Sequence, residues 1–174
     1  MKIEIEIGCG KGKFLVARAE AHPEIFFLGV DTAGKWMKPG MNKQEKRHLE
    51  NLKFIRGDVR KLLALPIFND NVSTFHVYFP DPWPKRRHHP RRLLSALFFK
   101  RLYQCLANGG FLHCATDHLD YHAAIQKALL EAKLPWRKKR ESRNQRLFEP
   151  QLQTNFEAKY AKEGRDLYYL ELGK

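Results

Sequence analysis

Long apolar runs are missing from this sequence of 174 residues. A membrane-spanning helix needs about 18 to 20 consecutive apolar residues, and no segment approaches that length. The first ten residues, MKIEIEIGCG, also lack the apolar stretch of a secretory signal peptide. We therefore expect a cytoplasmic protein that does not interact with membranes.

Cysteine is scarce, and the three cysteines are scattered at Cys9, Cys105 and Cys114. They are too few and too far apart for a disulfide framework or a zinc site, which is typical of a reducing compartment. The histidines form no metal motif either, because His88 and His89 are adjacent and His118 and His122 lack the glutamate of an H-E-x-x-H site. We expect buried thiols and no bound metal.

Acidic residues are outnumbered: 19 aspartates and glutamates stand against 32 lysines and arginines, for a net charge of +13 and a pI near 9.8. The apolar content of 43% is that of a globular protein. A basic run is usually only a solvated face, but this excess of charge favours a surface that follows the phosphates of a nucleic acid. The basic residues gather in three segments, at 35–47, 85–92 and 137–146.

The sequence does contain a regular alternation of short apolar runs and longer amphipathic ones. Apolar runs predict strands at 3–7, 25–30, 52–55, 72–79, 111–115 and 167–172. Helices are predicted at 13–21, 93–106, 120–132 and 156–162, with a short helix or turn at 59–65 and a basic stretch at 35–49 that Pro39-Gly40 breaks. This alternation, without a linker, predicts one domain over residues 1–174 with a doubly wound α/β fold and a parallel sheet.

The first predicted strand runs into a glycine loop that reads E-I-G-C-G-K-G. Glycines at Gly8, Gly10 and Gly12 allow a sharp turn and a close approach of a ligand to the backbone. A dinucleotide loop places its third glycine one position later, and a carboxylate at Glu6 would repel pyrophosphate. The same carboxylate suits the cationic sulfonium and amino groups of S-adenosyl-L-methionine. A purely structural strand-to-helix turn is the alternative.

Two further acids, Asp31 and Asp58, follow predicted strands. Ligands of doubly wound folds bind beyond the carboxyl ends of the strands. There Asp31 can accept hydrogen bonds from both ribose hydroxyls, and Asp58 can accept one from an adenine amino group. Each acid alone could instead be a helix N-cap. Together with Glu6, they favour a nucleoside pocket.

The fourth predicted strand ends in residues 79–92, which read FPDPWPKRRHHPRR. One carboxylate, Asp81, precedes the basic run, so the segment combines a candidate catalytic group with a candidate RNA-binding surface. Asp81 would either take part in chemistry on the molecule that the basic residues hold or only help to bind and position it. Trp83 would either stack on a base or fix the proline-rich loop as a hydrophobic plug.

Six motifs follow one another along the chain: E-I-G-x-G-x-G, G-V-D, G-D, F-P-D-P-W-P-K-R-R-H, A-T-D-H and T-N-F-E. Their combination resembles the bacterial tRNA (guanine-N(7)-)-methyltransferases over almost the whole chain. The resemblance implies a Rossmann-like, S-adenosylmethionine-dependent methyltransferase fold whose last strand is antiparallel. It also implies methyl transfer to N7 of a guanine in the variable loop of tRNA. Family members usually carry a further N-terminal segment, which we expect to be absent here.

The resemblance implies roles for individual residues as well. Cofactor-binding positions are Glu6, Gly8, Gly10, Gly12, Asp31, Asp58 and Asp81, and Asp81 is the catalytic candidate. Substrate-binding positions are Lys85, Asp117, Thr154, Asn155, Phe156 and Glu157. RNA-contacting positions are Arg87, His88, His89, Pro90, Arg91 and Arg92. Asp31 replaces the glutamate of many members, and the basic stretch at 35–47 fits the family pattern poorly.

Three other functions agree with parts of the sequence. A non-catalytic RNA-binding module on a methyltransferase fold would have no use for acids at every strand end. A dinucleotide-dependent oxidoreductase is disfavoured by the glycine spacing and by Glu6. A small-molecule methyltransferase would not explain the net charge of +13. The sequence does not distinguish a monomer from a homodimer.

Overall fold

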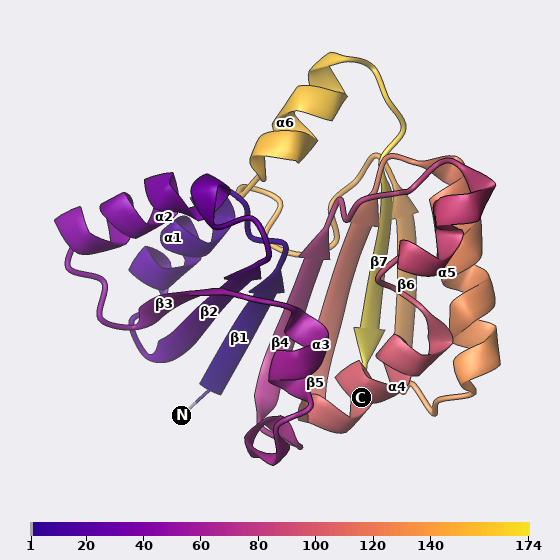
Figure 1. The fold of residues 1–174 in the computed structure, drawn as a ribbon, viewed down its shortest axis with the longest axis horizontal. Helices are drawn as coiled ribbons and strands as arrows, with labels where there is room; N and C mark the ends of the chain where they lie inside the picture. The colour runs from indigo at the N-terminus through magenta and orange to yellow at the C-terminus, as the bar shows by residue number, and fades with distance from the viewer. Residues whose placement is uncertain (1) are drawn as a thin grey trace.

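The computed structural model describes residues 2–174, which form a seven-stranded sheet with helices on both faces (Figure 1). The strands are β1 Lys2–Ile7, β2 Ile25–Asp31, β3 Leu52–Arg56, β4 Val72–Tyr78, β5 Leu106–Thr116, β6 Lys138–Arg143 and β7 Tyr168–Gly173. The α-helices are α1 Lys13–Ala21, α2 Gly34–Lys46, α3 Val59–Leu63, α4 Ala96–Cys105, α5 Leu119–Ala132 and α6 Asn155–Lys162. Short 3₁₀ helices span Pro66–Phe68 and Arg86–Arg91.

The strand order is β3-β2-β1-β4-β5-β7-β6. All pairings among the first five strands are parallel, whereas β7 runs antiparallel to both β5 and β6. The order therefore reverses between β1 and β4, where a doubly wound sheet opens a crevice for a ligand. The predicted fold, a mostly parallel doubly wound sheet with an antiparallel last strand, is confirmed.

Apolar side chains cover both faces of the sheet, because consecutive strand residues point to opposite sides. Phe27 packs with Leu15 of α1 on one face, while the next residue, Leu28, belongs to the larger cluster on the other face. That larger cluster also contains Phe99 of α4 and Tyr121 of α5. Each such fully buried side chain contributes about 1.5–3 kcal/mol to stability. The sheet is thus a rigid base for the loops at its carboxyl edge.

The predicted break at Pro39-Gly40 is wrong, since α2 runs unbroken from Gly34 to Lys46 with Pro39 inside it. A proline in a helix costs one backbone hydrogen bond, but it does not force the helix to end. Gly40 does not end the helix; it allows the helix to pack closely against its neighbours. A Cβ built on it would lie 2.8 Å from the Phe54 ring and 3.0 Å from the Lys11 carbonyl oxygen. Glycine therefore lets α2 approach the glycine loop closely.

Two other boundaries differ from the prediction. Helix α4 begins at Ala96 rather than residue 93, because the Ser95 hydroxyl caps it by accepting a hydrogen bond from the Phe98 N–H. It ends at Cys105, and Asn108-Gly109-Gly110 already belongs to β5. The segment KKRESR forms β6, which was not predicted because it has no apolar alternation. Pairing with β7 supplies its backbone hydrogen bonds instead.

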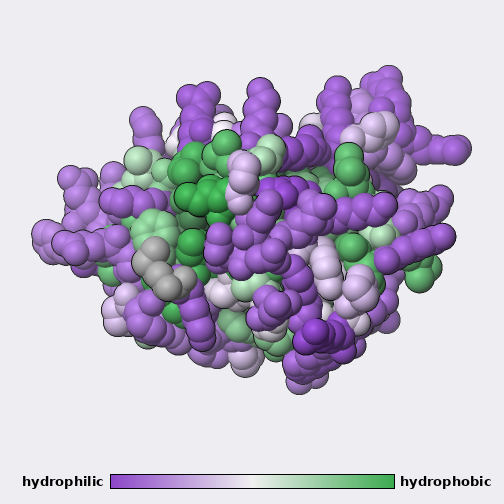
Figure 2. Space-filling view, turned by 90° about the horizontal axis from the view of Figure 1, so that it is seen from below, coloured by the Kyte–Doolittle hydropathy of each residue, from purple (hydrophilic) through white to green (hydrophobic). Residues whose placement is uncertain are grey.

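The helices divide between the two faces and one end of the sheet. In Figure 1, α4 and α5 lie side by side over one face, while α6 lies above the edge at which the parallel strands end. Viewed from the opposite edge, hydrophilic side chains project around most of the outline, and apolar ones are exposed nearer the middle (Figure 2). Within residues 2–174, no helix is both long and apolar enough to cross a membrane.

Candidate functional site

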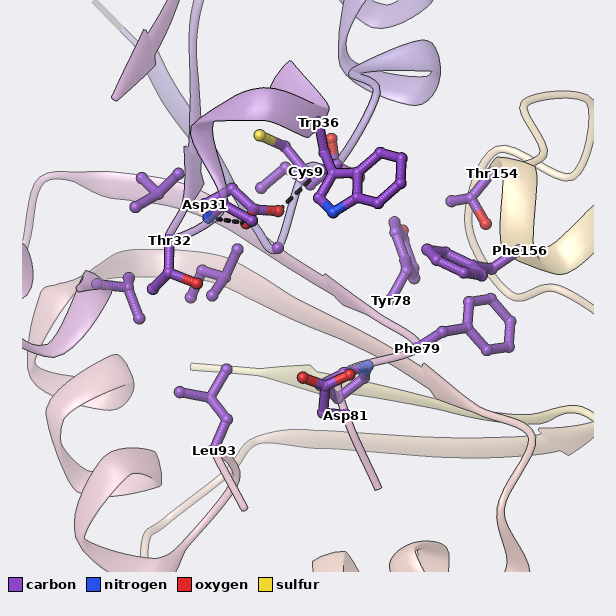
Figure 3. A pocket seen from close by; sticks show the side chains of 18 of the residues that line it. Cys9, Asp31, Thr32, Trp36, Tyr78, Phe79, Asp81, Leu93, Thr154 and Phe156 are labelled. Carbon is purple, nitrogen blue, oxygen red and sulfur yellow. Dashed lines mark hydrogen bonds between the residues drawn. The ribbon is translucent and has the colours of Figure 1, made fainter. Parts of the chain in front are cut away.

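A cavity of about 810 Å³ opens at the carboxyl edge of the sheet, where the strand order reverses (Figure 3). Its lining includes all four acids that the sequence places at strand ends: Glu6, Asp31, Asp58 and Asp81. They come from β1, β2, the loop after β3 and the loop after β4. A volume of this order is typical of sites for small molecules and cofactors. The fold therefore brings the predicted cofactor acids into one place.

The glycine loop joins β1 to α1 along one wall of this cavity. Gly8, Gly10 and Gly12 have φ angles of 77°, 49° and 65°, in the left-handed region that favours glycine. Asp31 holds the loop, because one carboxylate oxygen accepts a hydrogen bond from the Gly10 N–H at 3.0 Å. The other accepts one from the Ala33 N–H at 2.8 Å. Each oxygen keeps a second lone pair for a ligand hydroxyl.

Glu6 carries an unusual charge environment. It is only 4% exposed, and its Oε2 atom has no hydrogen-bond partner among residues 2–174. Burial raises the pKa of Glu6 to about 8; the nearby Asp31 carboxylate adds to the rise and the Arg146 guanidinium opposes it. An orphaned carboxylate at a cavity wall stabilises a cation placed beside it. The donor set thus fits a ligand with an ammonium or sulfonium group.

The position of Asp58 is compatible with both roles that the sequence leaves open, a helix N-cap and an acid of a ligand pocket. Its carboxylate caps α3 by accepting a hydrogen bond from the Arg60 N–H at 2.9 Å, and it also lines the cavity.

The Cys9 thiol is buried in the glycine loop, and burial raises its pKa well above the ordinary value, so it is a poor nucleophile. Among residues 2–174, no three His, Cys, Asp or Glu side chains gather as a metal site.

Asp81 lies in an exposed loop that follows β4 and lines the cavity opposite the glycine loop. The loop is strained at two points, because Phe79 and Trp83 have φ angles of 52° and 45°, which bulky residues rarely adopt. The Phe79 N–H donates to the Ala115 carbonyl oxygen at 2.8 Å, which ties the start of the loop to β5. Figure 3 shows the Asp81 carboxylate at the cavity, below Trp36 and Tyr78.

The first turn of α6 closes the cavity on one side. Thr154, Asn155 and Phe156 line it, and Phe156 is 48% exposed. Trp36, from the first turn of α2, borders the same cavity and is 50% exposed (Figure 3). Trp36 is not among the site residues predicted from the sequence. The sequence did contain a signal for it: Trp36 is an apolar residue in a largely basic helix, and it lies five residues after the strand-end acid Asp31.

Neither of the two predicted substrate-binding acids lines the cavity. Glu157 is 2% exposed and is saturated with partners: it accepts hydrogen bonds from the Arg146 guanidinium, the Tyr169 hydroxyl and the Thr154 N–H. It forms a capping box with Thr154, which fixes the start of α6. Asp117 directly follows β5 and forms an ion pair with Arg165 at 2.7 Å.

The basic side chains of residues 85–92 differ in where they lie: some are exposed or line the cavity, and one is buried. Lys85 and Arg87 are exposed to solvent. Arg91 lines the cavity, and its guanidinium carbon lies 5.0 Å from the centroid of the Trp83 ring, as in a cation–π contact. Arg92 points the other way: it is 8% exposed and binds the Pro82 carbonyl oxygen and the Asp120 carboxylate. The structure thus separates Arg92 from the exposed members of the segment.

A buried polar network under the cavity was also missed. The Glu4 carboxylate binds the Arg18 guanidinium at 2.7 Å and His76 at 2.9 Å, and all three side chains are almost fully buried. Burial alone would raise the pKa of Glu4, but His76 and Arg18 outweigh it and hold that pKa below its usual range. Arg18 also pairs with Glu149, which anchors the segment that leads to α6.

The known proteins that this chain resembles agree with the fold and the site described above. Residues 1–170 match the sequence family described as "Putative methyltransferase". A tRNA (guanine-N(7)-)-methyltransferase from Rubrobacter xylanophilus is 30% identical over 170 residues, which cover 98% of this chain and 75% of the relative. The chain belongs to the tRNA (guanine-N(7)-)-methyltransferase family. The resemblance inferred from the sequence motifs is confirmed.

Other members of the family match more closely but over a shorter range. The tRNA (guanine-N(7)-)-methyltransferase of Alkalilimnicola ehrlichii is 40% identical over 117 residues, or 67% of this chain. The chain spans about half the length of this relative and of its Bordetella pertussis counterpart, 49% in each case. Among solved structures, the 16S rRNA methyltransferase KamB superposes with a TM-score of 0.69 at 17% identity, covering 99% of this chain and 87% of that one. At this level of identity, the similarity shows only that the two proteins share a fold.

Proposed function

We propose that this protein transfers a methyl group from S-adenosyl-L-methionine to N7 of a guanine in the variable loop of tRNA, giving 7-methylguanosine. Family membership and a single cavity that holds Glu6, Asp31, Asp58 and Asp81 support this function. The observation that carries most weight is the orphaned, buried Glu6 carboxylate at the cavity wall, because it suits a cationic cofactor. As proposed, residues 1–174 act as one catalytic domain that works on tRNA in the cytoplasm.

S-adenosyl-L-methionine, when bound, supplies a methyl group on a positively charged sulfur. We assign Glu6 to the cationic methionine end of the cofactor and Asp31 to the ribose hydroxyls. Asp58 would accept a hydrogen bond from the adenine amino group. The glycine loop allows close approach, because Gly8 and Gly10 lack a Cβ and, beyond the adjacent residues, no atom lies within 4 Å of where one would be.

The N7 atom of guanine carries an in-plane lone pair and no proton, so the reaction needs no strong general base. The lone pair forms the new bond to the methyl carbon as the bond from that carbon to sulfur breaks, and positive charge moves onto the purine. Alignment of the two reactants can supply about 7–11 kcal/mol of the barrier. A carboxylate that binds the guanine N1–H and amino group stabilises the growing charge. Asp81, exposed at the cavity, takes this role.

The tRNA would approach across the loop after β4. Arg91 and the exposed Lys85 and Arg87 present positive charge beside the cavity, where RNA phosphates can bind. The target base must leave its stack to reach Asp81. Phe156 and Trp36 are half-exposed aromatic side chains at the cavity and offer surfaces for a flat base. Glu157 and Asp117 would support the site from behind, through α6 and Arg165.

The test is mass spectrometry of nucleosides from unmodified tRNA incubated with the protein and S-adenosyl-L-methionine. We expect 7-methylguanosine with the wild type and a decrease of at least 100-fold with Asp81→Asn, while tRNA affinity stays within a few-fold. Asp81→Asn keeps the size of the side chain, so it isolates the charge. Binding of tRNA without any methylated product would instead identify a non-catalytic RNA-binding module. A different methylated nucleoside would overturn the assignment to N7.

A further inference from the structure

The strained loop after β4 has to be held in place by contacts elsewhere. Non-glycine residues in the left-handed region cost about 1–3 kcal/mol each, and this loop has two of them, at Phe79 and Trp83. Both flank Asp81, so the position of its carboxylate depends on whatever keeps the loop from relaxing. The hydrogen bond from the Phe79 N–H to Ala115 fixes only the first end.

Arg92 fixes the second end. Its Nε atom donates a hydrogen bond to the Pro82 carbonyl oxygen at 2.8 Å, which closes the chain between these two residues into a ring. A second guanidinium nitrogen donates to the Asp120 carboxylate in the first turn of α5. The guanidinium carbon also lies 5.0 Å from the centroid of the Tyr121 ring, which is fully buried. One side chain therefore joins the loop to a helix of the core.

The surroundings of this contact leave Arg92 no access to RNA. It is 8% exposed, and its neighbour Arg91 faces the cavity and Trp83 instead. The Tyr121 hydroxyl accepts a hydrogen bond from the Leu94 N–H at 3.1 Å, so the chain after Arg92 is anchored to the same helix. His89 approaches the same Asp120 oxygen at 3.8 Å.

We propose that Arg92 and Asp120 form a clamp that positions Asp81, and that Arg92 is a positioning residue rather than an RNA contact. A lysine cannot replace Arg92 in the clamp, since the planar guanidinium is needed to reach a carbonyl and a carboxylate together. A phosphate contact behaves differently, because lysine serves there as a point charge. The clamp also predicts that loss of the negative charge on Asp120 impairs the site, although it raises the net positive charge by one.

The experiment compares Arg92→Lys, Arg92→Ala and Asp120→Asn with the wild type. Asp120 has a side chain that is 59% exposed, so its substitution tests the clamp without opening the core. Glu131→Gln is the matched control: it makes the same change of charge in the last turn of α5, where the only ion pair of Glu131 among residues 2–174 is with the exposed Lys127. Arg91→Ala is the control for loss of a charge that faces the RNA.

The first measurement is the rate of trypsin cleavage within residues 85–91, followed by mass spectrometry, and it does not depend on activity. The clamp predicts cleavage at least several-fold faster in Arg92→Lys and Asp120→Asn than in the wild type or Glu131→Gln. Equal rates in all four proteins would overturn it. Because this readout needs neither cofactor nor tRNA, it stands even if the wild type fails to methylate tRNA and the proposed function is wrong.

The second measurement rests on the proposed function and separates positioning from phosphate binding. Arg92→Lys and Asp120→Asn should lower kcat about 10- to 100-fold, the loss expected when a catalytic group moves by about 1 Å. They should leave the salt dependence of tRNA affinity unchanged, whereas Arg91→Ala should reduce its slope by about 0.7–0.9. If Arg92→Lys kept full activity while Arg92→Ala reduced the salt slope, Arg92 would be a phosphate contact and the proposal would fail.

Discussion

Replacement of Glu6 by glutamine tests whether the buried carboxylate is the group that receives a cation. The pKa of Glu6 is raised from its ordinary 4.5 to about 8, so at pH 7 only about a tenth of the molecules carry the charge. A bound cation stabilises the ionised form and so lowers this pKa. Binding of S-adenosyl-L-methionine at pH 7 should therefore release about 0.9 proton from Glu6, and almost none at pH 9.

Calorimetry in buffers of different ionisation enthalpy measures that proton release directly. The amino group of the ligand also titrates, but it does so in both proteins, so the difference between the wild type and Glu6→Gln isolates Glu6. We expect the affinity of the wild type, relative to Glu6→Gln, to rise about ten-fold between pH 7 and pH 9. Equal proton release from the two proteins at pH 7 would refute the reasoning.

The same carboxyl sets a pH dependence of stability in the protein without ligand. Its pKa is higher in the folded state, so the proton is held on folding and lost on unfolding. The stabilisation is complete below pH 4.5 and disappears as pH rises through about 8, with an upper bound of about 5 kcal/mol. Chemical denaturation of Glu6→Gln should lack this part of the decline with pH.

Two further substitutions test local features of the cavity walls. Gly40→Ala should destabilise the protein by about 1–3 kcal/mol in denaturant titration, because the added methyl group would meet the Lys11 and Gly12 backbone. In Gly34→Ala, the matched control, the nearest atoms are those of the flexible Arg56 side chain, so stability should change little; equal losses in both would contradict the packing argument. Asp58→Ser keeps an N-cap on α3 but shortens the side chain, so stability should stay within about 0.5 kcal/mol. Its affinity for S-adenosyl-L-methionine should fall about ten-fold by calorimetry, and an unchanged affinity would leave Asp58 as a cap only.

The sequence was sufficient to predict the architecture because the fold depends on patterns that are local. Apolar runs such as 25–30 are long enough to be strands covered on both faces, and most of them are followed by a helix or a glycine. Parallel strands bring their carboxyl ends to one edge, so acids far apart in the sequence could be expected to meet. Glu6, Asp31, Asp58 and Asp81 do line one cavity.

The errors arose where a contact distant in sequence decides the outcome. The KKRESR segment forms β6 because β7 offers a free edge, which no local pattern encodes. Gly40 reads as a helix breaker until the neighbouring Phe54 ring is seen. Glu157 and Arg92 are predicted from their motifs to bind substrate and RNA, and sequence alone could not show that both side chains are buried and hydrogen-bonded within the protein.

The charges of β6 matter for the behaviour of the protein in concentrated solution. This strand ends the sheet, so its outer backbone groups are not used by another strand of residues 2–174. An open strand edge invites a second molecule to extend the sheet, which is a common route to aggregation. Five of the six residues in KKRESR are charged, four of them positively, so a second copy would meet repulsion along its whole length. The charges on the open edge strand should therefore make it a poor template for a second copy of the chain.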